Sequence, residues 1–159
     1  MSEADPGKVV HAHTMKDTHT YLVHYPDHYP RATDPHYKDF EAFHHAHRAT
    51  ARCWVGLRIG FDECRDAQGV LAPVVVGSPQ PGLELHHDHI EFAVQNGVDL
   101  SALEVDYPGV SNPDEVGAWV ESGANFRWLC AYHHRMGAGA HSVDHSNWEA
   151  EQYIKGLVS

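Results

Sequence analysis

Basic residues are scarce in this sequence of 159 residues. Only 11 Lys and Arg stand against 22 Asp and Glu, which gives a formal net charge of −11. The imbalance lies after residue 52, where five basic residues accompany fifteen acidic ones. Proteins that bind nucleic acid without sequence preference use clustered Lys and Arg. The composition therefore argues against a chain that binds DNA strongly on its own.

The sequence also lacks the segments that direct a chain to a membrane. It has no apolar run of about 18 residues, the length that spans a bilayer. Its first residues, MSEADPGKVVHAHTMKD, have neither the basic start nor the apolar stretch of a signal peptide. With 42% hydrophobic residues and this length, we expect one compact, soluble domain in the cytoplasm.

Cysteine is rare, with only Cys53, Cys64 and Cys130. An odd number without a signal peptide indicates reduced thiols or metal ligands rather than disulfides. Cys53 and Cys130 fall in predicted strands, where a buried thiol is commonly a small apolar residue. Cys64 falls in a polar turn and requires another explanation.

The pattern along the chain predicts an extended N-terminal arm, residues 1–35, and a single domain over 36–159. The arm is rich in Pro and His without sustained periodicity, and only 18–24 is expected to form a strand. Helix starts are marked by the N-cap residues Asp34, Asn112 and Ser146, two of them followed by Pro. The predicted helices cover 36–52, 89–97, 113–120 and 147–158.

Short runs of β-branched and aromatic residues alternate with these helices. The first two such runs flank the polar turn DECRDAQG and are expected to form a hairpin, whereas 98–112 is expected to be irregular. The fold class is therefore α+β. The predicted strands cover 53–61, 70–77, 83–87 and 125–130.

Two of the 16 histidines stand side by side at the end of a predicted strand, in LELHHDHI. Leu83 and Leu85 alternate correctly into this pair, so His86 and His87 should point to opposite faces. One can then bind a divalent cation while the other takes a proton from water. A cation and a neutral imidazole together supply what phosphodiester hydrolysis requires.

A second segment, NFRWLCAYHH, follows at residues 125–134. Together the two segments resemble the HNH endonucleases, whose ββα-metal fold carries a ligand and a base at a strand end, an Asn in the hairpin and further ligands on a helix. The segment Leu-Glu-Leu-His-His and the spacing between Asn125 and His134 are similar to those of the bacteriocin DNases. The string HHDH is similar to the corresponding motif of phage resolvase-type enzymes. HHRMGAGAH resembles HNH proteins of actinobacterial phages. The resemblance covers about residues 83–157.

The resemblance implies a phage-encoded endonuclease that hydrolyses DNA in the host cytoplasm with one divalent cation (Mg, Mn, Ni or Zn). It assigns His86 and His134 to the metal, His87 to general base catalysis and Asn125 to backbone hydrogen bonds that aim the base. The register stays open, because Asp88-His89-Ile90 also matches the Asp-His-Ile of many HNH enzymes. In that register His89 is catalytic, and Asp88 can bind metal in either.

The chain departs from the family pattern four residues beyond His134, where a third ligand would stand and Ala138 is found. His141 is the expected replacement, reached either by two further helical turns or by a glycine turn. A site with two protein ligands, completed by phosphate and water, is the other possibility.

The resemblance also implies a structural zinc beside the active site. Cys130 and His133 have the two-residue gap of a zinc knuckle, which Cys64, or Cys53 with Cys64, would complete. Arg127, Arg135 and the arm are the expected DNA contacts, with a protein partner supplying the remaining affinity.

The main alternative is a non-catalytic structural, virion or assembly protein that keeps the scaffold around a closed metal site. An acidic DNA mimic is a third hypothesis, supported only by the charge.

Overall fold

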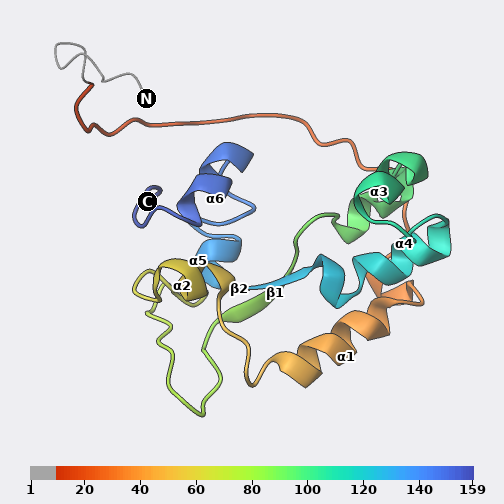
Figure 1. The fold of residues 1–159 in the computed structure, drawn as a ribbon, viewed down its shortest axis with the longest axis horizontal. Helices are drawn as coiled ribbons and strands as arrows, with labels where there is room; N and C mark the ends of the chain where they lie inside the picture. Colours follow the sequence, from red (N-terminus) through yellow and green to blue (C-terminus); the bar gives the residue numbers. More distant parts are fainter. Residues whose placement is uncertain (1–9) are drawn as a thin grey trace.

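A two-stranded antiparallel sheet lies at the centre of the computed structural model, which describes residues 10–159 (Figure 1). β1 (Leu83–His87) pairs with β2 (Phe126–Cys130) in a register that sets Leu83 opposite Cys130 and His87 opposite Phe126. These two strands carry or directly precede the predicted site residues, and both predicted strands are confirmed. The chain is a mixed α+β structure.

Short helices surround this ribbon. The α-helices among the described residues are α1 (Tyr37–His47), α2 (Trp54–Ile59), α3 (Leu100–Asp106), α4 (Pro113–Val120), α5 (Ala131–His134) and α6 (His145–Glu151). The short 3-10 helices are η2 (Arg31–Thr33), η3 (Phe92–Gly97) and η4 (Gly123–Asn125). Within the described part of the chain, none of the helices is long and apolar enough to cross a membrane.

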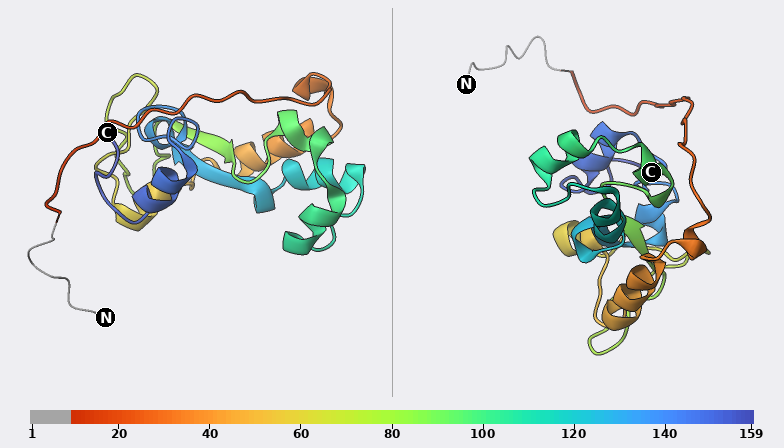
Figure 2. Two further views of the ribbon diagram at one scale, coloured as in Figure 1. Left: turned by 90° about the horizontal axis from the view of Figure 1, so that it is seen from above. Right: turned by 90° about the vertical axis from the view of Figure 1, so that its right-hand side faces the viewer.

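Two small apolar cores lie at opposite ends of the ribbon, one beside α2, α5 and α6 and the other beside η3, α3 and α4 (Figures 1 and 2). The first core includes Leu83 and Leu129 of the strands and Trp148 of α6. The second is built around Trp119 and Val120 of α4. The strands connect the two cores, so residues at the ribbon's ends are fixed from both sides.

The predicted hairpin of 53–61 and 70–77 is wrong. Residues Trp54–Ile59 form α2, and 70–77 contains no strand, only an isolated bridge between Arg65 and Leu71. Val75 and Val76 are 57% and 97% exposed, so this β-branched run packs against no neighbouring strand. The strand expected at 18–24 is also absent, and residues 10–30 form an extended arm without regular structure.

Local capping explains where the helices begin. Asn112 accepts a hydrogen bond from the backbone N–H of Glu115 at 3.0 Å and starts α4 as predicted. Asp99 caps α3 in the same way, so the segment 98–112 is not irregular as expected. α6 starts at His145, before the predicted cap, because Asp144 accepts from the N–H of Asn147 at 2.9 Å.

Three predicted helices are shorter in the structure. α1 occupies 37–47 of the predicted 36–52, and α6 ends at Glu151. The predicted helix over 89–97 is only the 3-10 helix η3.

Candidate metal centres

Three imidazoles face one another where β1 meets α5. His86, His134 and His141 each present a ring nitrogen within 4.8 Å of the others. The ring centroids are 5.1 Å apart for His86 and His134, and His141 lies 4.9 Å from each. Imidazole nitrogens in this arrangement are common ligands of Zn, Ni, Cu and Fe. These residues can hold one divalent cation.

Burial keeps the imidazole of His86 neutral. Burial, followed by the nearby His134 and His141, lowers the pKa of His86 to about 3. Burial likewise lowers the pKa of His134, against the opposing effect of Glu84. The buried Nδ1 of His86 has no hydrogen-bond partner among the described residues. A neutral imidazole with an unsatisfied nitrogen fits a cation ligand.

Glu84 of β1 orients one of these ligands. Its Oε2 lies 2.6 Å from Nδ1 of His134, and its two oxygens also accept from Arg135 at 2.9–3.0 Å. Although burial raises the pKa of Glu84, the bonds from Arg135 and His134 more than offset this and the net shift is downward. A carboxylate bound to Nδ1 directs Nε2 toward the cluster, as in carboxylate–histidine–metal arrangements.

A glycine-rich turn brings His141 back to His134. α5 ends at His134, and the backbone N–H groups of Ala140 and His141 donate to the carbonyls of His133 and His134 at 2.9 and 3.0 Å. Of the two routes predicted for His141, the structure takes the glycine turn. Ala138, where the HNH resemblance would place a third ligand, is buried.

His87 lies on the other side of the strand from His86. It is 8% exposed, and its ring stacks on Phe40 of α1 at a centroid distance of 5.5 Å. Its Nε2 lies 3.3 Å from the buried Glu121, while its Nδ1 lies 3.7 Å from Glu91. Two carboxylates therefore flank this imidazole.

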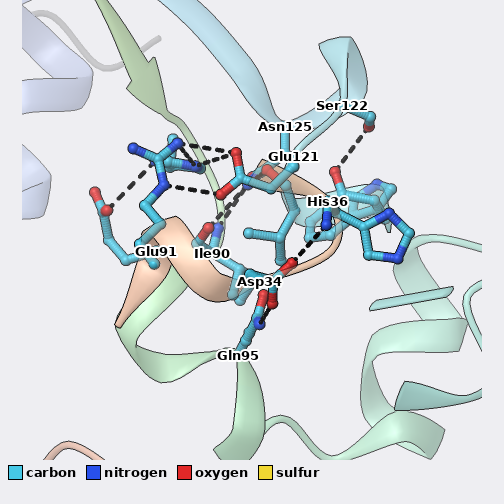
Figure 3. A network of polar contacts seen from close by, with 12 residues as sticks. Asp34, His36, Ile90, Glu91, Gln95, Glu121, Ser122 and Asn125 are labelled. Carbon is cyan, nitrogen blue, oxygen red and sulfur yellow. Dashed lines mark hydrogen bonds and ion pairs between the residues drawn. The ribbon is translucent and has the colours of Figure 1, made fainter. Parts of the chain in front are cut away.

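Asn125 fixes the loop that follows β1. Its side-chain oxygen accepts from the backbone N–H groups of His89 and Ile90 at 2.9 and 3.1 Å, and its amide donates to the carbonyls of Ile90 and Val120 at 2.8 and 3.0 Å (Figure 3). Its backbone carbonyl also accepts from Asp88 at 2.7 Å. The side chain is fully buried, so every bond replaces one to water.

The rival pair, Asp88 and His89, does not join the three-histidine cluster. Asp88 forms an ion pair with Arg127 at 2.7 Å, and His89 packs beside Tyr107 at a centroid distance of 5.2 Å. Arg127 and Arg135, the expected DNA contacts, are thus both paired with carboxylates of the chain itself.

A second cluster is buried in the first core. Cys53, Cys64, Cys130 and His133 are each at most 2% exposed and can bind a metal such as Zn. The sulfurs of Cys130, Cys53 and Cys64 lie 3.2, 3.6 and 3.9 Å from Nδ1 of His133. In tetrahedral zinc, with Zn–S of about 2.3 Å and Zn–N of about 2.0 Å, these atoms would be about 3.5 Å apart.

The thiols of this second cluster share their protons unequally. Hydrogen bonds with Cys130 and Cys64 lower the pKa of Cys53. For Cys64, the hydrogen bonds with Cys130 and Cys53 raise the pKa. The lowered pKa of Cys53 favours the thiolate form that metal binding requires.

α5 joins the two clusters. His133 faces the three cysteines, and the next residue, His134, faces His86 and His141. An open cavity of about 540 Å³ adjoins the three-histidine cluster. Residues of the arm, of the loop after β1 and of α6 line it, including His19, Tyr21, His86, His87, Asp88, His89, Glu91, His141 and Trp148.

Sequence comparisons add nothing to this geometry. No protein-family model, curated protein or solved structure matched the chain.

Sequence patterns did not identify Glu84, Glu91 or Glu121 as site residues. They also left open whether Cys53 belongs to the zinc site. In a chain with 22 acidic residues, Glu91 and Glu121 carry no distinguishing local signal. The alternation of β1 could have placed Glu84 on the face of His86.

Proposed function

We propose that the chain is a divalent-metal-dependent HNH endonuclease that hydrolyses DNA phosphodiester bonds. The observation that carries the proposal is the junction of β1 and α5. There three imidazoles face one another, and His87, the neighbour of His86 in the strand, lines the same cavity. The chain order of histidine pair, Asn125 and helix-borne His134 supports a ββα-metal scaffold for these residues.

The cation would be held by His86, His134 and His141, with Glu84 orienting His134. Mg, Mn, Ni and Zn are the candidates, and three imidazoles favour the last two. When bound, the cation supplies positive charge for the phosphate and activates water. Asp88 is paired with Arg127 and His89 packs beside Tyr107, so neither is proposed as a ligand of this cation.

His87 is the proposed general base. Its ring is held between Phe40 and the second strand, and its position at the cavity lets an unprotonated nitrogen take the proton of the attacking water. Asn125 supports this role through the loop, since its four side-chain hydrogen bonds fix the backbone directly after Asp88.

Plasmid nicking tests the proposal. Wild-type protein with added Mg, Mn, Ni or Zn is expected to convert supercoiled plasmid to the open circular form. His87→Ala should lower this rate by about 100-fold or more, because it removes the base. His45→Ala is the matched control, since His45 is an exposed histidine of α1. Nicking that persists unchanged in both His87→Ala and His89→Ala would contradict the catalytic assignment.

A protein partner is proposed to supply DNA affinity. Arg127 and Arg135 are each neutralised by a carboxylate of the chain, and the net charge is −11. Few cations therefore face a phosphate backbone.

The second candidate is a non-catalytic structural or virion protein, which is favoured by the net charge of −11 and by the pairing of Arg127 and Arg135 with carboxylates. Four ligands without solvent exposure are typical of structural zinc, which we propose as the occupant of the Cys53, Cys64, Cys130 and His133 site. A structural protein would bind zinc and give no cleavage with any added cation, so the nicking assay separates the two candidates.

A further inference from the structure

A buried carboxylate lies against the proposed general base. Glu121, at the end of α4, is 1% exposed, and its Oε2 lies 3.3 Å from Nε2 of His87. Figure 3 shows this carboxylate at the centre of a polar network that also includes Glu91 and Asn125. Nothing in the HNH resemblance assigns a function to this residue.

Arg31 holds the carboxylate in place. Its Nε donates to Oε1 of Glu121 at 3.0 Å and its Nη2 donates to Oε2 at 2.9 Å, so the pair is bidentate. The guanidinium lies 4.0 Å over the ring of Phe40, which in turn stacks on His87. Three separate elements therefore meet around the imidazole of His87. They are η2 with Arg31, α1 with Phe40 and the end of α4 with Glu121.

The protonation of Glu121 is consistent with this arrangement. Burial raises the pKa of Glu121, but the hydrogen bonds from His87 and Arg31 more than offset it, and the net shift is downward. An ionised carboxylate only accepts hydrogen bonds. The Nε2 atom facing it must then carry a hydrogen.

Two contacts compete with this assignment. Nη2 of Arg31 lies 3.5 Å from the same Nε2 and would need a lone pair there, but this distance is at the limit of a hydrogen bond and is longer than the 3.3 Å to Oε2 of Glu121. Glu91 lies 3.7 Å from Nδ1, beyond hydrogen-bond length, and is 44% exposed. The shorter, buried contact with Glu121 favours a hydrogen on Nε2.

We propose that Glu121 is a positioning residue that holds the His87 imidazole with its hydrogen on Nε2, leaving Nδ1 as the basic nitrogen toward the cavity. The proposal rests on the proposed function, because it concerns the nitrogen that would accept the proton of water. The orienting Asp of serine-protease triads fixes a histidine tautomer in the same physical way.

The tautomer can be measured without any activity. Long-range ¹H–¹⁵N correlation spectra of labelled protein, with the His87 signals assigned by their loss in His87→Gln, report which nitrogen carries hydrogen. A proton on Nε2 and a bare Nδ1 support the proposal. A bare Nε2, or a ring protonated on both nitrogens at the pH of the assay, overturns it. Glu91→Gln is expected to leave the proton on Nε2.

Kinetics of Glu121→Gln provide the second test. We expect kcat for plasmid nicking to fall by about tenfold or more, with KM and the affinity for added Zn or Ni near the wild-type values. Glu115→Gln makes the same chemical change on α4, where Glu115 bonds only Ser111 and Asn112, and should keep wild-type kinetics. Wild-type kcat in Glu121→Gln would overturn the proposal.

The two tests fail differently. A wild-type protein without nicking activity would contradict the proposed endonuclease, while the spectrum of His87 would still decide whether Glu121 fixes its tautomer. A Glu121→Gln protein that does not fold, by circular dichroism, leaves the wild-type spectrum as the deciding measurement.

Discussion

Asn125 makes four side-chain hydrogen bonds beside the candidate site. It is fully buried and bonds two backbone N–H groups and two carbonyls, all from the loop after β1 or the end of α4. A smaller hydroxyl side chain has only one donor hydrogen and cannot serve all four groups. The single residue therefore determines the path of the backbone that leaves His87.

Replacing Asn125 should cost more than replacing an exposed cap. We expect Asn125→Ala to lower the free energy of unfolding by about 2–4 kcal/mol, because it leaves buried N–H and C=O groups unpaired. Asn112→Ala, which removes the N-cap of α4, should cost about 1 kcal/mol. Urea unfolding followed by Trp fluorescence measures both, and equal losses would contradict the assigned role of Asn125.

At the scale of elements, the turn after α5 replaces the helix on which a third ligand would be expected. A Cβ at Gly139 would lie 2.6 Å from the backbone N of Arg135 and 2.7 Å from the carbonyl carbon of His134. Backbone atoms cannot move aside as a flexible side chain does. Glycine is thus required for the turn to return His141 to His134.

Gly139→Ala should therefore weaken metal binding. We expect the affinity for added Zn or Ni to fall by about tenfold or more, because the turn must open and move His141. Gly137→Ala is the matched control, since its Cβ would meet only the ring of Tyr132, at 3.0 Å. Isothermal titration measures both variants, and wild-type affinity in Gly139→Ala would show that the turn does not position a ligand.

Local signals explain which elements could be predicted. The start of α4 at Asn112-Pro113 and the two strands of the ribbon are specified by residues that are close together in the sequence. They were predicted correctly, with small shifts at their ends. Residues 53–61 were predicted as a strand from their aromatic and β-branched content, but α2 forms there, with Cys53 and Val55 buried in the first core. Tertiary packing overrides weak propensity in such short segments.

The same distinction applies to the candidate site. The close approach of His86 and His134 follows from strand pairing and could be anticipated. Glu84 was within reach of strand alternation but was missed. Glu121 is 34 residues from His87, and Arg31 is 90 residues from Glu121. No periodicity in the sequence specifies contacts at such separations, so those partners emerged only from the structure.

At the scale of the molecule, the first core contains the cysteine cluster where apolar side chains would otherwise meet. Its buried members include Leu83, Leu129 and Trp148 as well as the three cysteines. A metal at this cluster would connect α2, the segment after it and the start of α5. Stability and the position of His134 are then linked through the neighbouring His133.

Removal of zinc should therefore destabilise the whole chain. We expect Cys64→Ser to lose about one Zn per chain by elemental analysis and to unfold at least about 10 °C lower than wild type in a thermal scan. His86→Ala, which alters only the three-histidine cluster, should keep that zinc. A wild-type protein that contains no zinc after purification from zinc-supplemented cells, and is insensitive to strong chelators, would contradict the structural site.

The ion pairs of Arg127 with Asp88 and of Arg135 with Glu84 have a consequence for specificity. A protein that neutralises few phosphates releases few counterions, so its own affinity for DNA should vary little with ionic strength. Under the proposed function, such an enzyme would not slide along the duplex in search of a target. The place of cleavage would be chosen by whatever delivers the chain to DNA.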